Sequence, residues 1–551
     1  MTYRPIALAI ALSAMASAQA QLDNVVEVEN TYRPTVKDAN KMNVLPEVKQ
    51  TEVKHYNVNY ASTLQPTTSY VFQPMEAAQS DAADRKLRSY VTLGGGTNGN
   101  VDTRINIFAK PQLQDIINAD FSFSGHCGKV DATFAPTDKW ESRFYTTRAL
   151  ASYAHYFKNN AALSFKADVL QQVFNYQQNG VLSATDKQHN TGFDFSIGMT
   201  PYAIGNFRIG GEVGTRVFSQ KYLPMTALYN DKLSETQVWG KATSAYSISQ
   251  QHGVGLDLSA LTTNYDADDF KNYGSYDVTP YYNYTNEHMN LRLGAILHFN
   301  SGLKSGFNVA PDVCLRYHAS PTLDFVANVQ GGEVMNDARH LNAMTPYWSY
   351  FSNMMVGAEQ LHHQFDVVRA KAGAEWNVAQ GLYLNLGIGY DKSKNRAELL
   401  NYAQVVTADG SLMHVDADLR YNYQDVLSAG ASLRLNGWES DAKGMDETLL
   451  LWRPNTEIKA DATWRVWRGL RIGADIAIDT YDKNHSVYYR RPNTTNLGAS
   501  ISYATPLSLL SRDTQMSVFL RGNNLLNNNY DQFLGYRAQR ANGLVGVAVT
   551  F

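Results

Sequence analysis

The sequence predicts an all-β protein, a transmembrane antiparallel β-barrel of about 22 strands with long extracellular loops and a short extended N-terminal segment. Three observations support this fold class. Apolar and polar residues alternate over runs of about ten residues or more, the polar face of these runs carries full charges, and the connections alternate between short and long. A soluble β-sandwich also alternates, so the decision rests on the three observations together.

The alternation is clear in residues 458–466, where apolar and charged side chains take opposite faces of one extended strand. Arg468 and Gly469 then make a tight turn, and residues 470–478 alternate again, which predicts a hairpin. Repeating this reading along the chain gives strands at 86–97, 101–110, 114–126, 142–157, 161–175, 189–201, 206–219, 233–248, 253–266, 275–286, 288–300, 306–319, 322–333, 363–378, 382–393, 411–423, 426–437, 455–467, 470–482, 493–505, 515–525 and 543–551.

The lengths of the connections predict which end of the barrel faces the periplasm. Short periplasmic turns and long outer loops are typical of outer-membrane barrels. Short turns are expected at 158–160, 204–206, 320–322, 379–381 and 468–469, and long stretches at 127–141, 176–188, 334–362, 393–411 and 437–455. The even strand count places both ends of the barrel on the periplasmic side.

The chain divides into three parts. Residues 1–20 predict a signal peptide, with Arg4 before an apolar core and Ala18-Gln19-Ala20 as a small-residue cleavage site. Residues 21–85 are polar and proline-containing and predict an extended segment, either periplasmic or filling the lumen. Residues 86–551 form the barrel, so we expect an exported protein embedded in the lipid of the cell outer membrane.

Composition excludes several other classes. A net charge of -3 argues against a nucleic-acid partner, and two cysteines cannot form a disulfide framework. Gly94 to Gly99 fits G-x-G-x-x-G, but a strand follows where a dinucleotide site needs a helix, so a hairpin is expected. His340, His362 and His363 have no metal-site spacing. With no catalytic motif either, we expect no enzyme, no metal and no cofactor.

The last predicted strand, 543–551, carries a candidate signal for insertion into the outer membrane. Val545, Val547, Val549 and Phe551 share one face, and an aromatic residue ends the strand. This pattern predicts the signal that the barrel-assembly machinery reads during insertion; an ordinary C-terminal edge strand is the alternative.

The longest predicted loop, residues 334–362, is unusually apolar for a loop exposed to water. Its aromatic residues include Tyr347, Trp348, Tyr350 and Phe351. We expect this loop to fold into the lumen, cap the barrel as a lid, or contact a surface protein partner; packing on neighbouring loops is the alternative.

The run from Arg521 to Tyr530, rich in Asn and Leu, resembles the close of TonB-dependent receptor barrels, as does a final strand that ends in Phe. The resemblance implies twenty-two strands, import of large or scarce nutrients, and a short box near the mature N-terminus that binds TonB. Val25, Val26, Glu27 and Val28 are the candidate box; a periplasmic strand or another partner-binding segment is the alternative. The interval before the first strand is too short for a standard plug domain.

Together these observations predict an outer-membrane transport or channel protein, a TonB-dependent receptor-like barrel. Because a lumen of this width leaks unless it is filled, we expect the N-terminal segment and the loops to fill it. The alternative is a structural or accessory subunit of an outer-membrane assembly, secretion or surface-export complex. Residues 21–85 could bind TonB or another periplasmic partner; in the structural-subunit alternative they would bind a periplasmic partner, and the aromatic loop would bind another surface protein.

Overall fold

The computed structural model describes residues 89–132, 138–157, 161–177, 187–221, 232–266, 270–303, 305–348, 360–400, 404–441, 450, 452–481, 492–507 and 514–551. The predicted signal peptide, the N-terminal segment with its candidate box (Val25 to Val28), and Tyr350 and Phe351 of the aromatic loop lie outside these residues.

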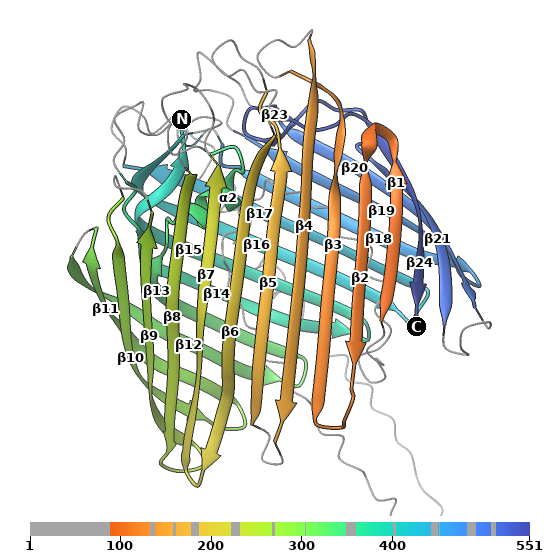
Figure 1. The fold of residues 1–551 in the computed structure, drawn as a ribbon. Helices are drawn as coiled ribbons and strands as arrows, with labels where there is room; N and C mark the ends of the chain where they lie inside the picture. The colour runs from red at the N-terminus through yellow and green to blue at the C-terminus, as the bar shows by residue number, and fades with distance from the viewer. Residues whose placement is uncertain are drawn as a thin grey trace, which may run out of the picture. The chain divides into compact units, whose positions relative to one another are not determined.

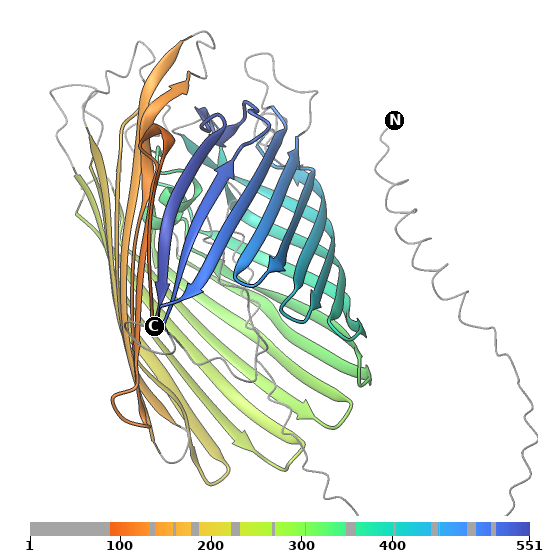
Figure 2. The ribbon, with the colours of Figure 1, turned by 90° about the vertical axis from the view of Figure 1, so that its right-hand side faces the viewer.

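Within the described residues, 22 antiparallel strands form one closed sheet (Figures 1 and 2). Each strand pairs with the next along the chain, because alternating sequence and short connections leave neighbours adjacent. The strands are β1 (Tyr90–Gly96), β2 (Val101–Ala109), β3 (Asp115–Asp131), β4 (Lys139–Tyr156), β5 (Ala162–Phe174), β6 (Gln188–Ile204), β7 (Phe207–Lys221), β8 (Lys232–Ser247), β9 (His252–Tyr265), β10 (Tyr273–Thr285), β11 (Met289–Gly302), β12 (Gly306–Ser320), β13 (Leu323–Val334), β14 (Gln364–Ala379), β15 (Leu382–Leu399), β16 (Val405–Tyr423), β17 (Leu427–Ser440), β18 (Thr456–Trp467), β19 (Leu470–Thr480), β20 (Thr494–Pro506), β21 (Gln515–Asn523) and β24 (Asn542–Thr550).

The first and last strands close the barrel. β1 pairs with β24 in a register that runs from Tyr90 opposite Thr550 to Gly96 opposite Leu544. Ser89 and Phe551 exchange backbone hydrogen bonds of 3.0 and 2.9 Å. Closure removes both sheet edges, so the backbone donors and acceptors of the edge strands are satisfied without water, as a membrane-spanning sheet requires.

The two faces of the sheet differ as the alternation predicts. Exposed large apolar side chains occupy the outward positions, including Val545 on β24 and Phe551 directly after it. Near the end that carries the short turns, the outward face holds a girdle of aromatic rings, as expected where lipid meets water. Exposed members of this girdle are Tyr202, Phe207, Tyr246, Tyr317, Phe325, Trp376, Tyr423, Trp464, Trp467 and Tyr503. The inward face is polar and charged, so lipid covers the outside and water or protein fills the lumen.

Each of the predicted strands corresponds to one of the 22 in the sheet, but several predicted loops were too long. The predicted loop at 127–141 is wrong in part because β3 continues to Asp131 and β4 begins at Lys139. The predicted loop at 393–411 is similarly shortened, since β15 reaches Leu399 and β16 begins at Val405. These hairpins keep pairing beyond the membrane-spanning part, where alternation in the sequence is weaker. The glycine-rich stretch after Leu93 is the expected hairpin, with β1 and β2 antiparallel.

The connection between β13 and β14 contains α2 (Ala338–Met344), which the sequence predicted only as loop. The connection between β21 and β24 contains two short strands that were also not predicted, β22 (Asp531–Phe533) and β23 (Tyr536–Arg537). No helix among the described residues is both long enough and apolar enough to cross a membrane.

Candidate functional site at the mouth of the barrel

Two loops fold back into the barrel at the end opposite Ser89 and Phe551. One consists of residues 335–348 between β13 and β14 and is called here the helical loop. The other consists of residues 524–541 between β21 and β24 and is called here the C-terminal loop. In Figure 1, α2 of the helical loop lies near the end that carries the long connections. This is the extracellular end if the short turns face the periplasm.

Asp337 starts α2 by capping its first turn. Its Oδ1 accepts a hydrogen bond of 2.7 Å from the backbone N–H of His340. A helix of seven residues is too short to be stable alone, because nucleation costs more than so few hydrogen bonds return. The helix therefore depends on its contacts with the barrel.

Polar side chains on the inward faces of β6 and β8 hold the start of the helix. Gln237 Nε2 donates to Asp337 Oδ2 at 2.7 Å, and the Ala338 N–H donates to Glu235 Oε2 at 2.8 Å. Arg339 forms an ion pair with Asp194. Each wall residue lies on an inward position of its strand, so the helical loop is bound from inside the lumen.

The rest of the loop is held in the same way by β5, β6 and β7. Asn342 donates to Gln172 at 2.9 Å and accepts from Asn190 at 2.5 Å. Gln220 Nε2 donates to the carbonyl of Trp348 at 2.7 Å. Four consecutive strands, β5 to β8, thus contact one short loop through amide and carboxylate groups.

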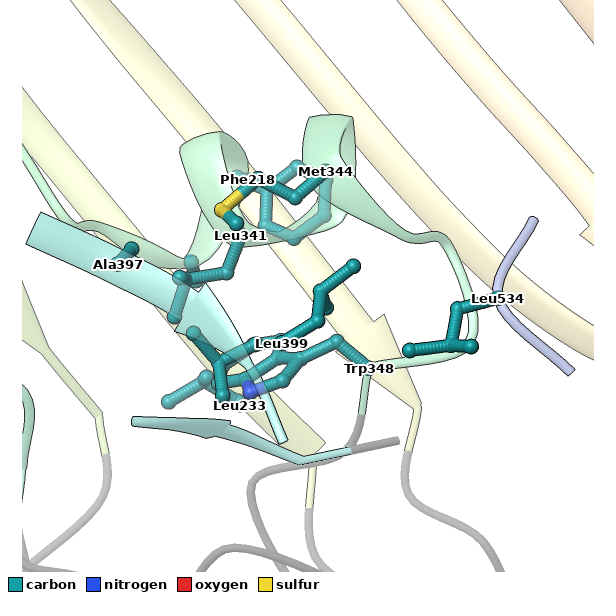
Figure 3. Close-up of a cluster of buried hydrophobic side chains, with 10 residues drawn as sticks. Phe218, Leu233, Leu341, Met344, Trp348, Ala397, Leu399 and Leu534 are labelled. Carbon is teal, nitrogen blue, oxygen red and sulfur yellow. The ribbon is translucent and has the colours of Figure 1, made fainter. Parts of the chain in front are cut away.

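An apolar cluster reinforces these hydrogen bonds (Figure 3). Leu341, Met344 and Trp348 of the helical loop point toward one another and toward side chains of the barrel. The partners are Phe218 and Leu233 from β7 and β8, Ala397 and Leu399 from β15, Val405 from β16 and Leu534 from the C-terminal loop. The helical loop therefore joins two parts of the wall that are separated by β9 to β14, namely β7–β8 and β15–β16.

Tyr347 joins the two inward-folded loops. Its ring stacks on Tyr536 of the C-terminal loop with centroids 3.4 Å apart and planes 4° from parallel. Phe533 and the β5 residue Phe174 pack against the same ring at 5.7 and 5.2 Å. Only 2% of the Tyr347 side chain is exposed, and this burial raises the pKa of its hydroxyl above the ordinary value. The aromatic group is thus the contact between loops from distant parts of the sequence.

The C-terminal loop has its own anchors. Asp531 and Arg537 form a buried ion pair of 3.0 Å across the β22–β23 turn. Arg540 Nε donates to Asp131 at the end of β3 at 2.7 Å. Asn524 donates to the carbonyls of Asn528 and Gln539 at 2.8 and 2.9 Å, which closes the base of the loop. The loop presents Phe533 and Tyr536 from a fixed position.

Histidines lie at the base of the helical loop. His363 is buried and its Nδ1 accepts a 2.9 Å hydrogen bond from the Asn336 N–H, so the imidazole of His363 is neutral when the helical loop is docked. Burial lowers the pKa of His363, and the nearby Glu333 and Asp337 oppose that shift. Burial likewise lowers the pKa of His340. Among the described residues, no three His, Cys, Asp or Glu side chains are arranged to hold a metal ion.

The structure places the predicted site residues in different settings. Tyr347 and Trp348 are buried in the helical loop, whereas Tyr350 and Phe351 lie outside the described residues. The predicted insertion signal, Val545, Val547, Val549 and Phe551, lies on the outward positions of β24 and its end. The sequence did not identify the wall residues that bind the loop, because polar side chains occur at inward positions of every strand and alternation does not show which of them contact a loop. Asp337 could have been found, since an Asp before Ala-Arg-His-Leu is an N-cap pattern.

No protein-family model matches the chain, and no curated protein sequence matches it. Solved structures do match. The iron transporter FrpB from Neisseria meningitidis aligns with a TM-score of 0.64 at 10% identity, over 85% of this chain and 82% of that one. The copper transporter OprC aligns with a TM-score of 0.61 at 11% identity, over 84% and 81%. The ferric-catecholate import receptor Fiu from E. coli K12 gives 0.61 at 10% identity, over 85% and 82%.

The barrel has the fold of the TonB-dependent receptors. The resemblance noted at the C-terminal run is thereby confirmed at the level of the fold, and an outer-membrane barrel is the architecture that all three neighbours share with this chain.

Proposed function

We propose that this protein is an outer-membrane transporter whose lumen is closed by the two inward-folded loops and by residues 21–85. The observation that carries the proposal is the docking of the helical loop across the lumen, from β5–β8 to β15–β16. Most contacts at the helix are side-chain hydrogen bonds and one ion pair, which form and break without unfolding the barrel. The names of the structural neighbours, two transporters and an import receptor, agree with this assignment.

In this proposal the helical loop is a lid. Tyr347 and Trp348 are its buried anchors, and Tyr350 and Phe351 belong to the same lid. Residues 21–85 close the periplasmic half, and Val25, Val26, Glu27 and Val28 bind TonB or another periplasmic partner. Val545, Val547, Val549 and Phe551 direct insertion by the barrel-assembly machinery.

The test is single-channel conductance in planar lipid bilayers. The mature protein is compared with a variant lacking residues 21–85 and with a variant whose lid is loosened by Tyr347→Ala. We expect the mature protein to stay closed, each single change to give brief openings, and the two changes together to give a large steady conductance. Tyr390→Ala, which truncates an outward-facing ring, is the matched control and should stay closed.

Two outcomes would count against transport. A mature protein that conducts steadily has no closed lumen. A pore that stays closed in all variants, together with a stoichiometric partner set recovered from native membranes, supports the alternative of a scaffold subunit in a membrane complex.

A further inference from the structure

An aromatic ring flanked by two cations lies on the inner wall, two residues along β8 from the anchor Gln237. Trp239 of β8 is directly opposite Gly214 of β7. A Cβ atom added to Gly214 would lie 2.6 Å from Cζ2 of the indole, so the ring covers the glycine and only glycine permits this position. The Arg216 guanidinium carbon and Lys241 Nζ lie 5.4 and 5.9 Å from the ring centroid.

These two cations differ from other basic residues on the same wall. Arg148 pairs with Asp168 at 2.5 Å, and Lys166 approaches Glu212 at 3.7 Å. Across the part of the chain that the structure describes, neither Arg216 nor Lys241 forms an ion pair within 4 Å with a carboxylate. Lys241 lies directly opposite Glu212 of β7, but Glu212 instead approaches Lys166 and accepts a 2.7 Å hydrogen bond from Ser196. The two cations beside Trp239 therefore have no close ion-pair partner among the described residues.

The carboxylate opposite Arg216 is paired with the helical loop. The cross-strand neighbours of Arg216 on the inner face are Asp194 of β6 and Gln237 of β8. Arg339 of the loop pairs with Asp194, and Asp337 of the loop accepts from Gln237. Docking of the loop thus occupies the carboxylate that lies directly opposite Arg216.

We propose that Trp239, Arg216 and Lys241 form a binding site for an aromatic carboxylate on the periplasmic side of the docked helical loop. The ligand ring stacks on the indole, and its carboxylate accepts charge-assisted hydrogen bonds from the guanidinium and the ammonium group. The inference rests on the proposed function, since it names the class of compound that the closed lumen holds.

Loop docking and ligand binding are coupled through Asp194. When Arg339 holds Asp194, Arg216 is free to bind the ligand; when the loop leaves, Asp194 becomes available to Arg216. By thermodynamic linkage, the ligand then favours the docked loop by the same factor by which the docked loop favours the ligand.

The experiment is calorimetric titration of the full mature protein in detergent with 2-naphthoate, against micelles alone as reference. The neutral 2-naphthamide is titrated in parallel. Since hydrogen bonds between charged groups contribute more than neutral ones, we expect Arg216→Gln and Lys241→Gln each to weaken naphthoate binding about tenfold or more. Trp239→Leu should weaken both compounds. Lys371→Gln, which removes a cation of β14 that pairs with Asp416 and lies away from Trp239, is the matched control and should bind normally.

The coupling has its own test. Arg339→Gln releases Asp194 to Arg216 and should weaken naphthoate binding severalfold, and adding Asp194→Asn should restore it. Equal affinity for naphthoate and naphthamide, or normal binding by Arg216→Gln, would overturn the site. Failure of the Asp194→Asn rescue would overturn the coupling.

These titrations use detergent and do not depend on conductance. If the barrel binds naphthoate but never opens, the binding site stands and the transport proposal fails. If the barrel opens but does not prefer naphthoate to naphthamide, the transport proposal stands and the binding site fails.

Discussion

Truncation of Tyr347 should release the helical loop without unfolding the barrel. Its ring is 2% exposed and packs against Tyr536, Phe533 and Phe174 at centroid distances of 3.4 to 5.7 Å. Removing a buried aromatic side chain costs about 3–5 kcal/mol. When the helical loop undocks, the Tyr347 ring enters water. Its removal therefore destabilises the docked state and leaves the undocked state unchanged. At about 1.4 kcal/mol per tenfold, even 3 kcal/mol lowers the docking equilibrium about a hundredfold.

Hydrogen exchange measured by mass spectrometry on peptides covering 337–348 reports this equilibrium directly. We expect the protection of α2 amides in Tyr347→Ala to fall about a hundredfold, while strands β5 to β8 keep theirs. Tyr347→Phe keeps the ring and should remain close to wild type. The double variant with Tyr536→Ala should cost less than the sum of the two single variants, by about 0.5–1.5 kcal/mol, because the stacked pair is lost only once. Unchanged protection in Tyr347→Ala would refute the assignment of Tyr347 as an anchor of the loop.

Three further predictions follow from other parts of the structure. Burial lowers the pKa of His363, and its Nδ1 must stay unprotonated to accept the hydrogen bond from the Asn336 N–H. Docking of the helical loop should therefore be fully stable above about pH 6.5, the ordinary histidine value, and weaken as the pH falls below it. The same exchange experiment at pH 7.5 and 5 should show this, and His363→Gln should flatten the dependence. Gly469→Ala should lower the free energy of unfolding, measured in urea, by more than about 1–2 kcal/mol. The φ angle of Gly469 is +77°, and the new Cβ would lie 2.1 Å from the Ala504 carbonyl oxygen. Gly95→Ala is the control and should cost much less, because a Cβ at Gly95 meets no atom within 4 Å. Val547→Arg places a charge on the lipid face of β24 and should cost about 2–4 kcal/mol in folding titrations with lipid vesicles; equal effects from Ala548→Arg, which faces the lumen, would contradict the orientation of that strand.

The sequence by itself determined the barrel. Alternation has a period of two residues and needs only local reading, so each predicted strand, the hairpin at Arg468 and Gly469, and the outward face of Val545 and Phe551 followed from neighbours in the chain. Boundaries failed where pairing alone extends a hairpin, as at the tip of β15 and β16, where Arg396 to Leu399 pair with Val405 to Ala408, because a hydrogen-bonded ladder needs no amphipathic pattern.

Only the tertiary structure decided how the mouth is arranged. Tyr347 stacks on Tyr536, although nearly two hundred residues separate them in the sequence. Asp194 pairs with Arg339 rather than with Arg216 directly opposite, because the helical loop reaches it from inside the lumen. The sequence identified an apolar loop and a charged wall, but which charge pairs with which depends on distances that closure of the barrel creates.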